Sequence, residues 1–299
     1  MVTVTTCREI ADLVAGARAR GERIGFVPTM GALHAGHAAL VRAALDRCAF
    51  VVVSVFVNPT QFGPGEDFDR YPRTLDADRE LLAETGSVAV LFAPSAHEVY
   101  GNAAADGATG GLGRRTSVVV GHIADRWEGS RRPGHFDGVA LVVTKLLGIV
   151  RPDLAFFGEK DYQQLCVVRQ VVEDLKLRVE IVGCPTVREP DGLALSSRNR
   201  YLTESERSLA PAIFAALTDA RTAWRAGADA AAVQRLVVDH LRQRCGNDLV
   251  TDYVGVVDGA TLEPLEATTT LSQIGEGARP RILVAAQLGG THLLDNIEL

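Results

Sequence analysis

Short apolar runs alternate with amphipathic stretches along the chain up to residue 187. The runs at 24–27, 50–57, 88–92, 154–157 and 179–182 are largely apolar, and β-branched residues are common in them. Strands that are apolar on both faces are typical of a parallel sheet covered by helices. The pattern therefore predicts an α/β unit, and its first strand is expected to end at Pro28 because proline has no N–H to donate.

Helices are expected between these strands. Apolar side chains recur three and four residues apart in three stretches, which predicts helices that each bury one face. The three sets are Ile10, Leu13, Val14 and Ala17; Leu40, Val41, Ala44, Leu45 and Cys48; and Val139, Val142, Val143, Leu146, Leu147 and Val150.

The pattern changes after residue 203, where helices rich in Ala and Leu are expected at 208–224 and 230–244. Strands are expected at 252–257, 281–285 and 291–297. This order predicts a smaller α+β domain, and we place the boundary near Arg188. The predicted domains are therefore residues 1–187 and 188–299.

Composition narrows the class of protein. The 299 residues are 47% hydrophobic and 23% charged, an ordinary globular balance. The net charge of -6 argues against a nucleic-acid partner, because a phosphate backbone requires a basic surface. Five cysteines without a C-x-x-C pair indicate reduced thiols and no structural zinc. Without a leader or a run that could span a bilayer, we expect a soluble, cytoplasmic protein with no membrane partner.

Residues 23–45 hold the first candidate site. A predicted strand leads through a glycine-bearing turn into a helix that begins near His34, so His34 and His37 share its first turn. Unpaired N–H groups and the helix dipole favour an anion there, and two imidazoles can donate hydrogen bonds to phosphate. The alternative is a helix start with two surface histidines.

Polar residues also follow the second predicted strand. Asn58 and Gln61 carry amides that donate and accept, which suits a substrate with hydroxyls and a carboxylate. An ordinary Asn-Pro turn is the alternative. Asp76 and Asp78 could reach a magnesium ion, but an exposed helix start is the expected use of them, so the metal ligands stay open.

Two basic segments come next along the chain. Arg131, Arg132 and His135 precede a predicted helix, where they form either an anion site or a solvated loop. Lys160 follows a buried strand and offers a point charge for phosphate, and Gln164 lies one helical turn beyond it. A capped helix is the alternative there.

Two loops complete the pattern. Ser196, Ser197 and Arg198 combine two hydroxyls with a guanidinium, which suits polyphosphate. The segment 101–115 is rich in Gly and Ala and has no periodicity, so it predicts a flexible loop.

Six strings in this order resemble the pantothenate synthetase family, and the resemblance extends from Ile24 to the closing T-H-L-L-D-N-I. They are P-T-M-G-A-L-H-A-G-H, N-P-T-Q-F, D-F-D-R-Y-P-R, R-P-G-H-F, F-G-E-K-D-Y-Q-Q and L-S-S-R-N-R-Y-L. The first contains the His-x-Gly-His signature of the nucleotidyltransferase superfamily. Two features depart from the family: the segment 101–115 and Leu195, which stands where Met is usual.

The resemblance implies a Rossmann-like nucleotide- and pantoate-binding domain and a C-terminal lid domain in a homodimer. It implies that ATP, pantoate and β-alanine, with Mg²⁺, give pantothenate, AMP and pyrophosphate through a pantoyl adenylate. The implied catalytic residues are His34, His37 and Lys160. The implied substrate-binding residues are Asn58, Gln61 and Gln164. The implied ATP-binding residues are Met30, Gly31, Ala32, Leu33, His34, Ala35, Gly36, His37, Gly158, Glu159, Lys160, Asp161, Val187, Leu195, Ser196, Ser197 and Arg198.

Two other functions stay open. Another small nucleotidyltransferase would keep the phosphate site but would lack the N-P-x-Q-F and K-D-Y-Q-Q strings. A non-catalytic nucleotide sensor would need a cleft but would not need both His34 and Lys160.

Overall fold

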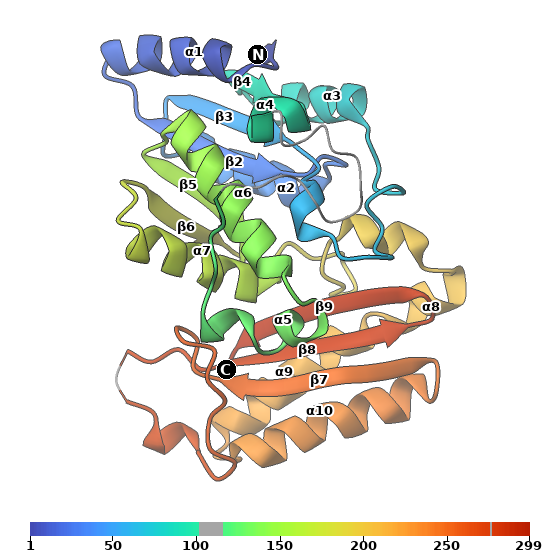
Figure 1. Ribbon diagram of the computed structural model, residues 1–299. Coiled ribbons are helices and arrows are strands. Elements are labelled where there is room, and N and C mark those ends of the chain that lie inside the picture. Colours follow the sequence, from blue (N-terminus) through green and yellow to red (C-terminus); the bar gives the residue numbers. More distant parts are fainter. Residues whose placement is uncertain (102–115, 276) are drawn as a thin grey trace. The chain divides into compact units, whose positions relative to one another are not determined.

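The computed structural model describes residues 1–101, 116–275 and 277–299 (Figure 1). The predicted flexible loop at 101–115 therefore lies outside the described residues, apart from Gly101. The chain forms two compact units. The first unit comprises Met1–Glu159 and Val167–Pro185, and the second comprises Lys160–Cys166 and Thr186–Leu299.

A six-stranded parallel sheet forms the centre of the first unit, as the apolar runs predicted. Its strand order is β1-β4-β3-β2-β5-β6, and all pairings are parallel. The strands are β1 (Val2–Val4), β2 (Ile24–Thr29), β3 (Phe50–Val55), β4 (Val90–Phe92), β5 (Leu154–Gly158) and β6 (Glu180–Cys184). The sequence did not predict β1, because a three-residue run has no recognisable period.

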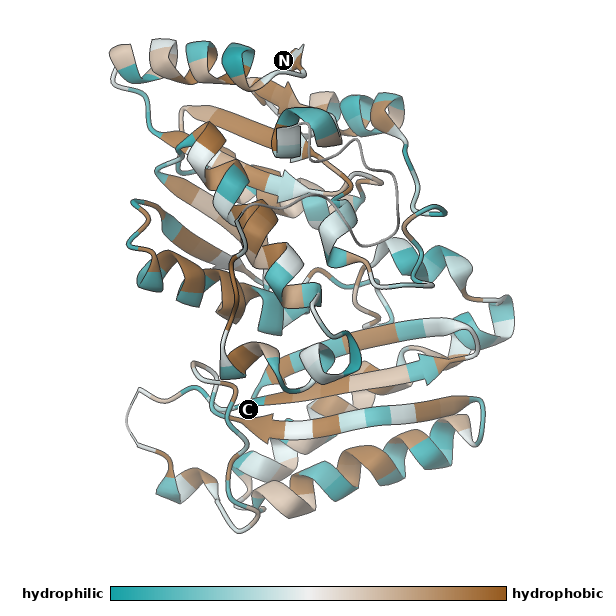
Figure 2. Cartoon of the chain, in the orientation of Figure 1, coloured by the Kyte–Doolittle hydropathy of each residue, from teal (hydrophilic) through white to brown (hydrophobic). Residues whose placement is uncertain are grey.

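Helices lie on both faces of this sheet (Figure 1). The helices of this part of the chain are α1 (Cys7–Ala19), α2 (Ala35–Leu45), α3 (Leu75–Thr85), α4 (Ala96–Tyr100), α5 (Glu128–Arg131), α6 (His135–Val150) and α7 (Tyr162–Asp174), and its 3-10 turns are η1 (Pro59–Gln61), η3 (His122–Ala124) and η4 (Glu159–Asp161). Residues 162–166 of α7 belong to the second unit. Buried side chains of α2 and α3 share one cluster with the strands, whereas α6 packs against α7. Figure 2 shows the strands between them as predominantly hydrophobic.

Pro28 does not end the first predicted strand. Strand β2 continues to Thr29 and stays in register with β3, with Pro28 opposite Ser54. The hydroxyl of Thr29 donates to the Ser54 carbonyl at 2.7 Å, and the Phe56 amide donates to the Thr29 carbonyl at 3.0 Å. Proline removes only its own donor, so bonds on either side of it hold the strand in place.

The second unit contains a three-stranded antiparallel sheet in the order β7-β8-β9. Its strands are β7 (Leu249–Val257), β8 (Arg281–Leu288) and β9 (Thr291–Glu298). Its helices are α8 (Glu204–Leu209), α9 (Ala212–Arg225) and α10 (Ala230–Cys245), with 3-10 turns η5 (Ser197–Tyr201) and η6 (Leu271–Gln273). The helix predicted at 208–224 corresponds largely to α9, but it begins at Ala212 rather than at residue 208, because the chain breaks between α8 and α9 at Pro211. Trp224 is fully buried in the core of this unit.

No helix among the described residues is both long and apolar enough to cross a membrane.

Candidate active site

Three neighbouring strands of the first unit end at the same edge of the sheet. Strands β3, β2 and β5 are adjacent and parallel, so the segments that follow them start side by side. Met30–His37 follows β2, Asn58–Gln61 follows β3, and Gly158 and Glu159 lie at the end of β5. Ligands of open parallel sheets bind at this edge.

The loop between β2 and α2 has two consecutive left-handed residues. Gly31 has φ of 84° and Ala32 has φ of 51°. A left-handed alanine costs about 1–2 kcal/mol, so other contacts must hold the loop. The Asp78 side chain supplies them: its Oδ1 accepts from the Leu33 amide at 2.8 Å, and its Oδ2 accepts from the Ala32 amide at 3.2 Å.

Asp78 is therefore not part of an exposed helix start. Its side chain is only 2% exposed, although Asp76, two residues earlier on α3, is exposed as predicted. The sequence suggested an outward direction because both carboxylates lie in the first turn of the helix. Only the fold brings the first turn of α3 against the loop after β2.

Backbone contacts indicate which ring nitrogen of His34 and of His37 carries the proton when the ring is neutral. His34 caps α2, and its Nδ1 accepts from the Gly36 amide at 3.1 Å. The Nδ1 of His37 accepts from the His34 amide at 3.3 Å, and the ring centroids are 4.2 Å apart. A backbone N–H can only donate, so each neutral ring carries its proton on Nε2. That tautomer makes Nε2 the donor toward a phosphate oxygen.

Asn58 and Gln61 are both buried and are bonded to each other. The Nδ2 of Asn58 donates to Gln61 Oε1 at 3.0 Å and to the Gly138 carbonyl at 3.2 Å. Its Oδ1 accepts from the Tyr100 hydroxyl at 2.6 Å and from Thr60. The side-chain amide of Asn58 thus bonds to four residues of the protein. The turn expected as the alternative, η1, accounts only for its bond with the Thr60 amide.

Gln61 also links the two groups of predicted ligands. Its Nε2 lies 3.2 Å from the Sδ of Met30, the first residue of the loop after β2. The predicted pantoate residue and the predicted ATP loop therefore meet within one unit.

His135 contacts the main chain of Gln61, and Arg132 contacts His135. The Nδ1 of His135 lies 2.8 Å from the Gln61 carbonyl, and its Nε2 lies 3.1 Å from an Arg132 nitrogen. Arg132 makes two further bonds to the Glu66 carboxylate, at 2.6 and 2.8 Å. Burial alone would raise the pKa of Glu66, but its hydrogen bonds and the Arg132 charge lower the pKa overall. Arg132 is thus paired with Glu66 and only partly exposed, and His135 is buried, so a solvated loop describes only Arg131, which is exposed. The anion site stays a prediction.

Lys160 belongs to the second unit, where its position depends on β9. Its Nζ lies 3.3 Å from Asp161 Oδ1, and its side chain is 19% exposed. The Lys160 carbonyl accepts from Asn296 Nδ2 at 2.9 Å, and Arg281 donates to the Asn296 Oδ1. Asn296 was not recognised from the sequence as a residue that affects the site, because only the fold brings β9 to residue 160.

The Ser-Ser-Arg loop lies in the same unit. The Leu195 amide donates to the Val187 carbonyl at 2.9 Å, so these two predicted ATP residues are adjacent. Ser196 caps η5, and its Oγ accepts from the Arg198 amide at 3.3 Å. Ser196, Ser197 and Arg198 are all partly exposed at this turn.

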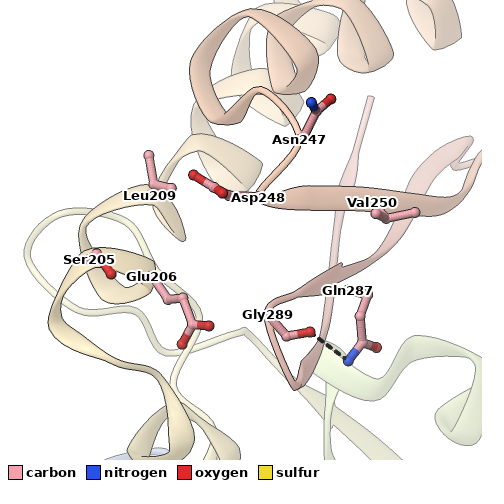
Figure 3. Close-up of a pocket in the computed structure, with 8 residues that line it drawn as sticks. All are labelled: Ser205, Glu206, Leu209, Asn247, Asp248, Val250, Gln287 and Gly289. Atoms are coloured by element: carbon pink, nitrogen blue, oxygen red, sulfur yellow. Dashed lines mark hydrogen bonds between the residues drawn. The ribbon is translucent and has the colours of Figure 1, made fainter.

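The sets of predicted residues are thus distributed over the two units. The first unit brings together the loop after β2, Asn58 and Gln61 with Gly158 and Glu159. The second unit holds Lys160, Asp161 and Gln164 on one segment and Val187 with 195–198 on another. A pocket of about 410 Å³ in the second unit is lined by other residues, including Glu206, Asp248 and Gln287 (Figure 3).

No metal centre is found in the part of the chain that the structure describes. No three His, Cys, Asp or Glu side chains there lie close enough to hold a metal ion together. Asp78, one of two carboxylates considered for magnesium, instead bonds to backbone amides.

One family model and the relatives described below match this chain over nearly its whole length. The family model described as pantoate-beta-alanine ligase matches residues 2–298. Pantothenate synthetase of Acinetobacter baumannii is 48% identical over 100% of this chain and 98% of its own length. The counterpart from Pseudomonas paraeruginosa is 49% identical over 100% and 99%.

The fold of this chain is similar to the folds of two solved structures. Pantothenate synthetase from Thermus thermophilus matches with a TM-score of 0.86 at 47% identity, over 100% of this chain and 99% of that one. A pantoate-beta-alanine ligase from Francisella tularensis, crystallised with beta-gamma ATP and beta-alanine, matches with a TM-score of 0.75 at 32% identity, over 100% and 97%.

Proposed function

The chain belongs to the pantoate–β-alanine ligase family, and from that premise we propose that it joins pantoate to β-alanine with consumption of ATP. The observation that carries the proposal is the 3.2 Å contact between Gln61 Nε2 and Met30 Sδ. This contact supports the proposal because Gln61, proposed to bind pantoate, touches the loop proposed to bind ATP, and a reaction between the two substrates requires them to be close.

The reaction is proposed to pass through pantoyl adenylate. A carboxylate resists attack by an amine, since its carbon is electron-rich and oxide is a poor leaving group. Attack of the pantoate carboxylate on the α-phosphorus of ATP forms an acyl–phosphate bond and releases pyrophosphate. The amine of β-alanine then forms the amide bond, loses a proton and releases AMP. One difficult step becomes two easier ones.

The two histidines stabilise the charge that develops as pyrophosphate leaves. Their backbone contacts keep Nδ1 as an acceptor, so Nε2–H can donate to phosphate without reorganisation. Asp78 fixes the loop that precedes them, which keeps the start of α2 in position for the nucleotide.

From the family resemblance, residues of the second unit are also proposed to bind phosphate. Lys160 and Arg198 provide positive charge, and Ser196 and Ser197 provide hydroxyl donors. From the family resemblance, Gln164 is proposed as a further residue that binds pantoate. Residues 188–299 are proposed as a lid that protects the adenylate from water, with residues 1–187 as the nucleotide- and pantoate-binding domain.

Magnesium is expected with ATP from the family resemblance. The described residues contain no cluster that fits the ion, so no residue is assigned as its ligand and no step depends on it. A homodimer in the cytoplasm is likewise proposed from the resemblance alone.

The test is pyrophosphate release by the purified protein with ATP and with pantoate or β-alanine omitted in turn. We expect release to depend on pantoate and to become sustained only when β-alanine is added. Release that required a nucleotide or nucleotide-like acceptor in place of pantoate would support a different nucleotidyltransferase. Nucleotide binding without any turnover would support the sensor.

A further inference from the structure

The orientation of the Asn58 side-chain amide is fixed by the backbone. The Thr60 amide donates to one end of it at 3.3 Å, and the Gly138 carbonyl accepts from the other end at 3.2 Å. A backbone N–H can only donate and a carbonyl can only accept, so the first end is Oδ1 and the second is Nδ2. Gly138 permits this approach, because a Cβ there would lie 2.2 Å from the Thr60 carbonyl oxygen.

This orientation determines that of Gln61. The Nδ2 of Asn58 donates to Gln61 Oε1 at 3.0 Å, which leaves Nε2 at the opposite end, beside Met30. Reversing the Gln61 amide would place its NH₂ against the NH₂ of Asn58, where neither group can accept. Both side chains are more than nine-tenths buried, so an unpaired donor would carry the full cost of desolvation.

Tyr100 completes the arrangement. Its hydroxyl donates to Asn58 Oδ1 at 2.6 Å, the shortest contact that this amide makes. Tyr100 lies at the end of α4 and is 9% exposed, and its ring packs near Phe56 and beneath the Lys145 ammonium. The Gln61 main chain is held separately, through its carbonyl, by His135.

We propose that Tyr100 and Asn58 are positioning residues. They orient Gln61 so that its side chain can donate a hydrogen bond at the pantoate site but cannot accept one there. This inference rests on the proposed function, because it takes pantoate as the ligand of Gln61. An oxygen that accepts, from a hydroxyl or a carboxylate, is then selected at this position. A positively charged ammonium, which can only donate, is rejected, because it would leave two donors facing each other.

The experiment is a double-mutant cycle on the full-length protein. The first substitution is Tyr100→Phe, which removes the hydroxyl and keeps the ring. The second is Gln61→Met, which keeps the length of the side chain and removes its amide. KM and kcat are measured for pantoate, β-alanine and ATP in all four proteins, together with thermal unfolding. Tyr253→Phe on β7 is the matched control.

Tyr100→Phe is expected to raise the pantoate KM about three- to tenfold, the range for one lost hydrogen bond, and to leave the ATP KM unchanged. In the Gln61→Met background the same substitution should change the pantoate KM by less than about twofold, because its effect passes through Gln61. An equal effect in both backgrounds would overturn the proposal, since Tyr100 would then act on its own. An unchanged pantoate KM in Tyr100→Phe would overturn it as well.

A second variant tests the selected chemistry directly. Asn58→Asp replaces the donor that faces Gln61 Oε1 by an acceptor, so the Gln61 amide should reverse and present its oxygen. Two pantoate analogues serve as inhibitors, each with one of the two hydroxyls replaced by an ammonium. For one of them, the ratio of its affinity to the affinity for pantoate should be at least fivefold higher in Asn58→Asp than in the wild type. A ratio equal to that of the wild type for both analogues would contradict the proposal. A wild-type protein that makes no pantothenate would refute the proposed function itself, so the two failures are distinguishable.

Discussion

Replacing Asp78 by Asn should weaken ATP binding although Asp78 is not proposed to contact ATP. The carboxylate accepts from the Ala32 and Leu33 amides, and Asn can accept at only one of these positions. The other amide then faces an NH₂ group. The loss of one charge-assisted bond costs about 1.5–3 kcal/mol, and the buried, unpaired amide adds about 1–3 kcal/mol.

Even the lower end of the combined cost, about 2.5–3 kcal/mol, exceeds the strain of about 1–2 kcal/mol at Ala32, whose φ is 51°. The loop should therefore relax out of its left-handed conformation, and the start of α2 should lose its position. We expect the ATP KM to rise at least ~10-fold, and the unfolding temperature of the protein to fall by about 6–12 °C. Steady-state kinetics with varied ATP and differential scanning fluorimetry measure the two effects.

Asp76→Asn is the matched control, because Asp76 lies on the same turn with its side chain 96% exposed. It should change neither quantity. If Asp78→Asn matched this control in both ATP KM and unfolding temperature, the assignment of Asp78 as the anchor of the loop would be refuted.

Three further predictions concern catalysis, pH and thiol chemistry. His34→Ala and Lys160→Ala should each lower kcat at least ~100-fold. The control is Lys176→Ala, which removes an exposed ion pair with Glu173 and should leave kcat unchanged. Near-normal kcat in a folded His34→Ala protein would contradict the proposed role. The pKa of Glu66 is lowered in the folded protein, so its stabilisation is present above the unfolded pKa of about 4.3 and is lost as the pH falls through the folded value. The difference in unfolding temperature between wild type and Glu66→Gln should therefore shrink from pH 6 to pH 3, and a constant difference would contradict this. Burial raises the pKa of Cys184 to about 11, so mass spectrometry should find it unmodified by iodoacetamide at pH 8 in the native protein and modified after unfolding.

The fold could be predicted largely from the apolar runs. Buried parallel strands leave a strong signal, and β2, β3 and β5 lie where that signal placed them. Two local rules failed. Proline was taken to end β2, but neighbouring bonds keep the strand paired, and the break before α9 was not recognised although Pro211 stands there.

The site could be predicted only as far as neighbouring residues determine it. The helix start at His34 depends on local spacing, and the structure agrees with it. The roles of Asp78 and Tyr100 depend on contacts with residues 46 and 42 positions away, which no local pattern reveals. That Asn58 binds substrate stays a prediction, and the bonds of its amide to protein groups at both ends support the positioning role proposed above.

The order of chemistry is the central claim, and isotope transfer tests it most directly. Pantoate labelled with oxygen-18 in its carboxylate is incubated with ATP and β-alanine, and the products are analysed by mass spectrometry. Attack of the carboxylate on the α-phosphorus predicts one labelled oxygen in each AMP, because the bridging oxygen stays with phosphorus when the amide forms. Label in inorganic phosphate, with ADP as the second product, would contradict the acyl-adenylate mechanism for this protein.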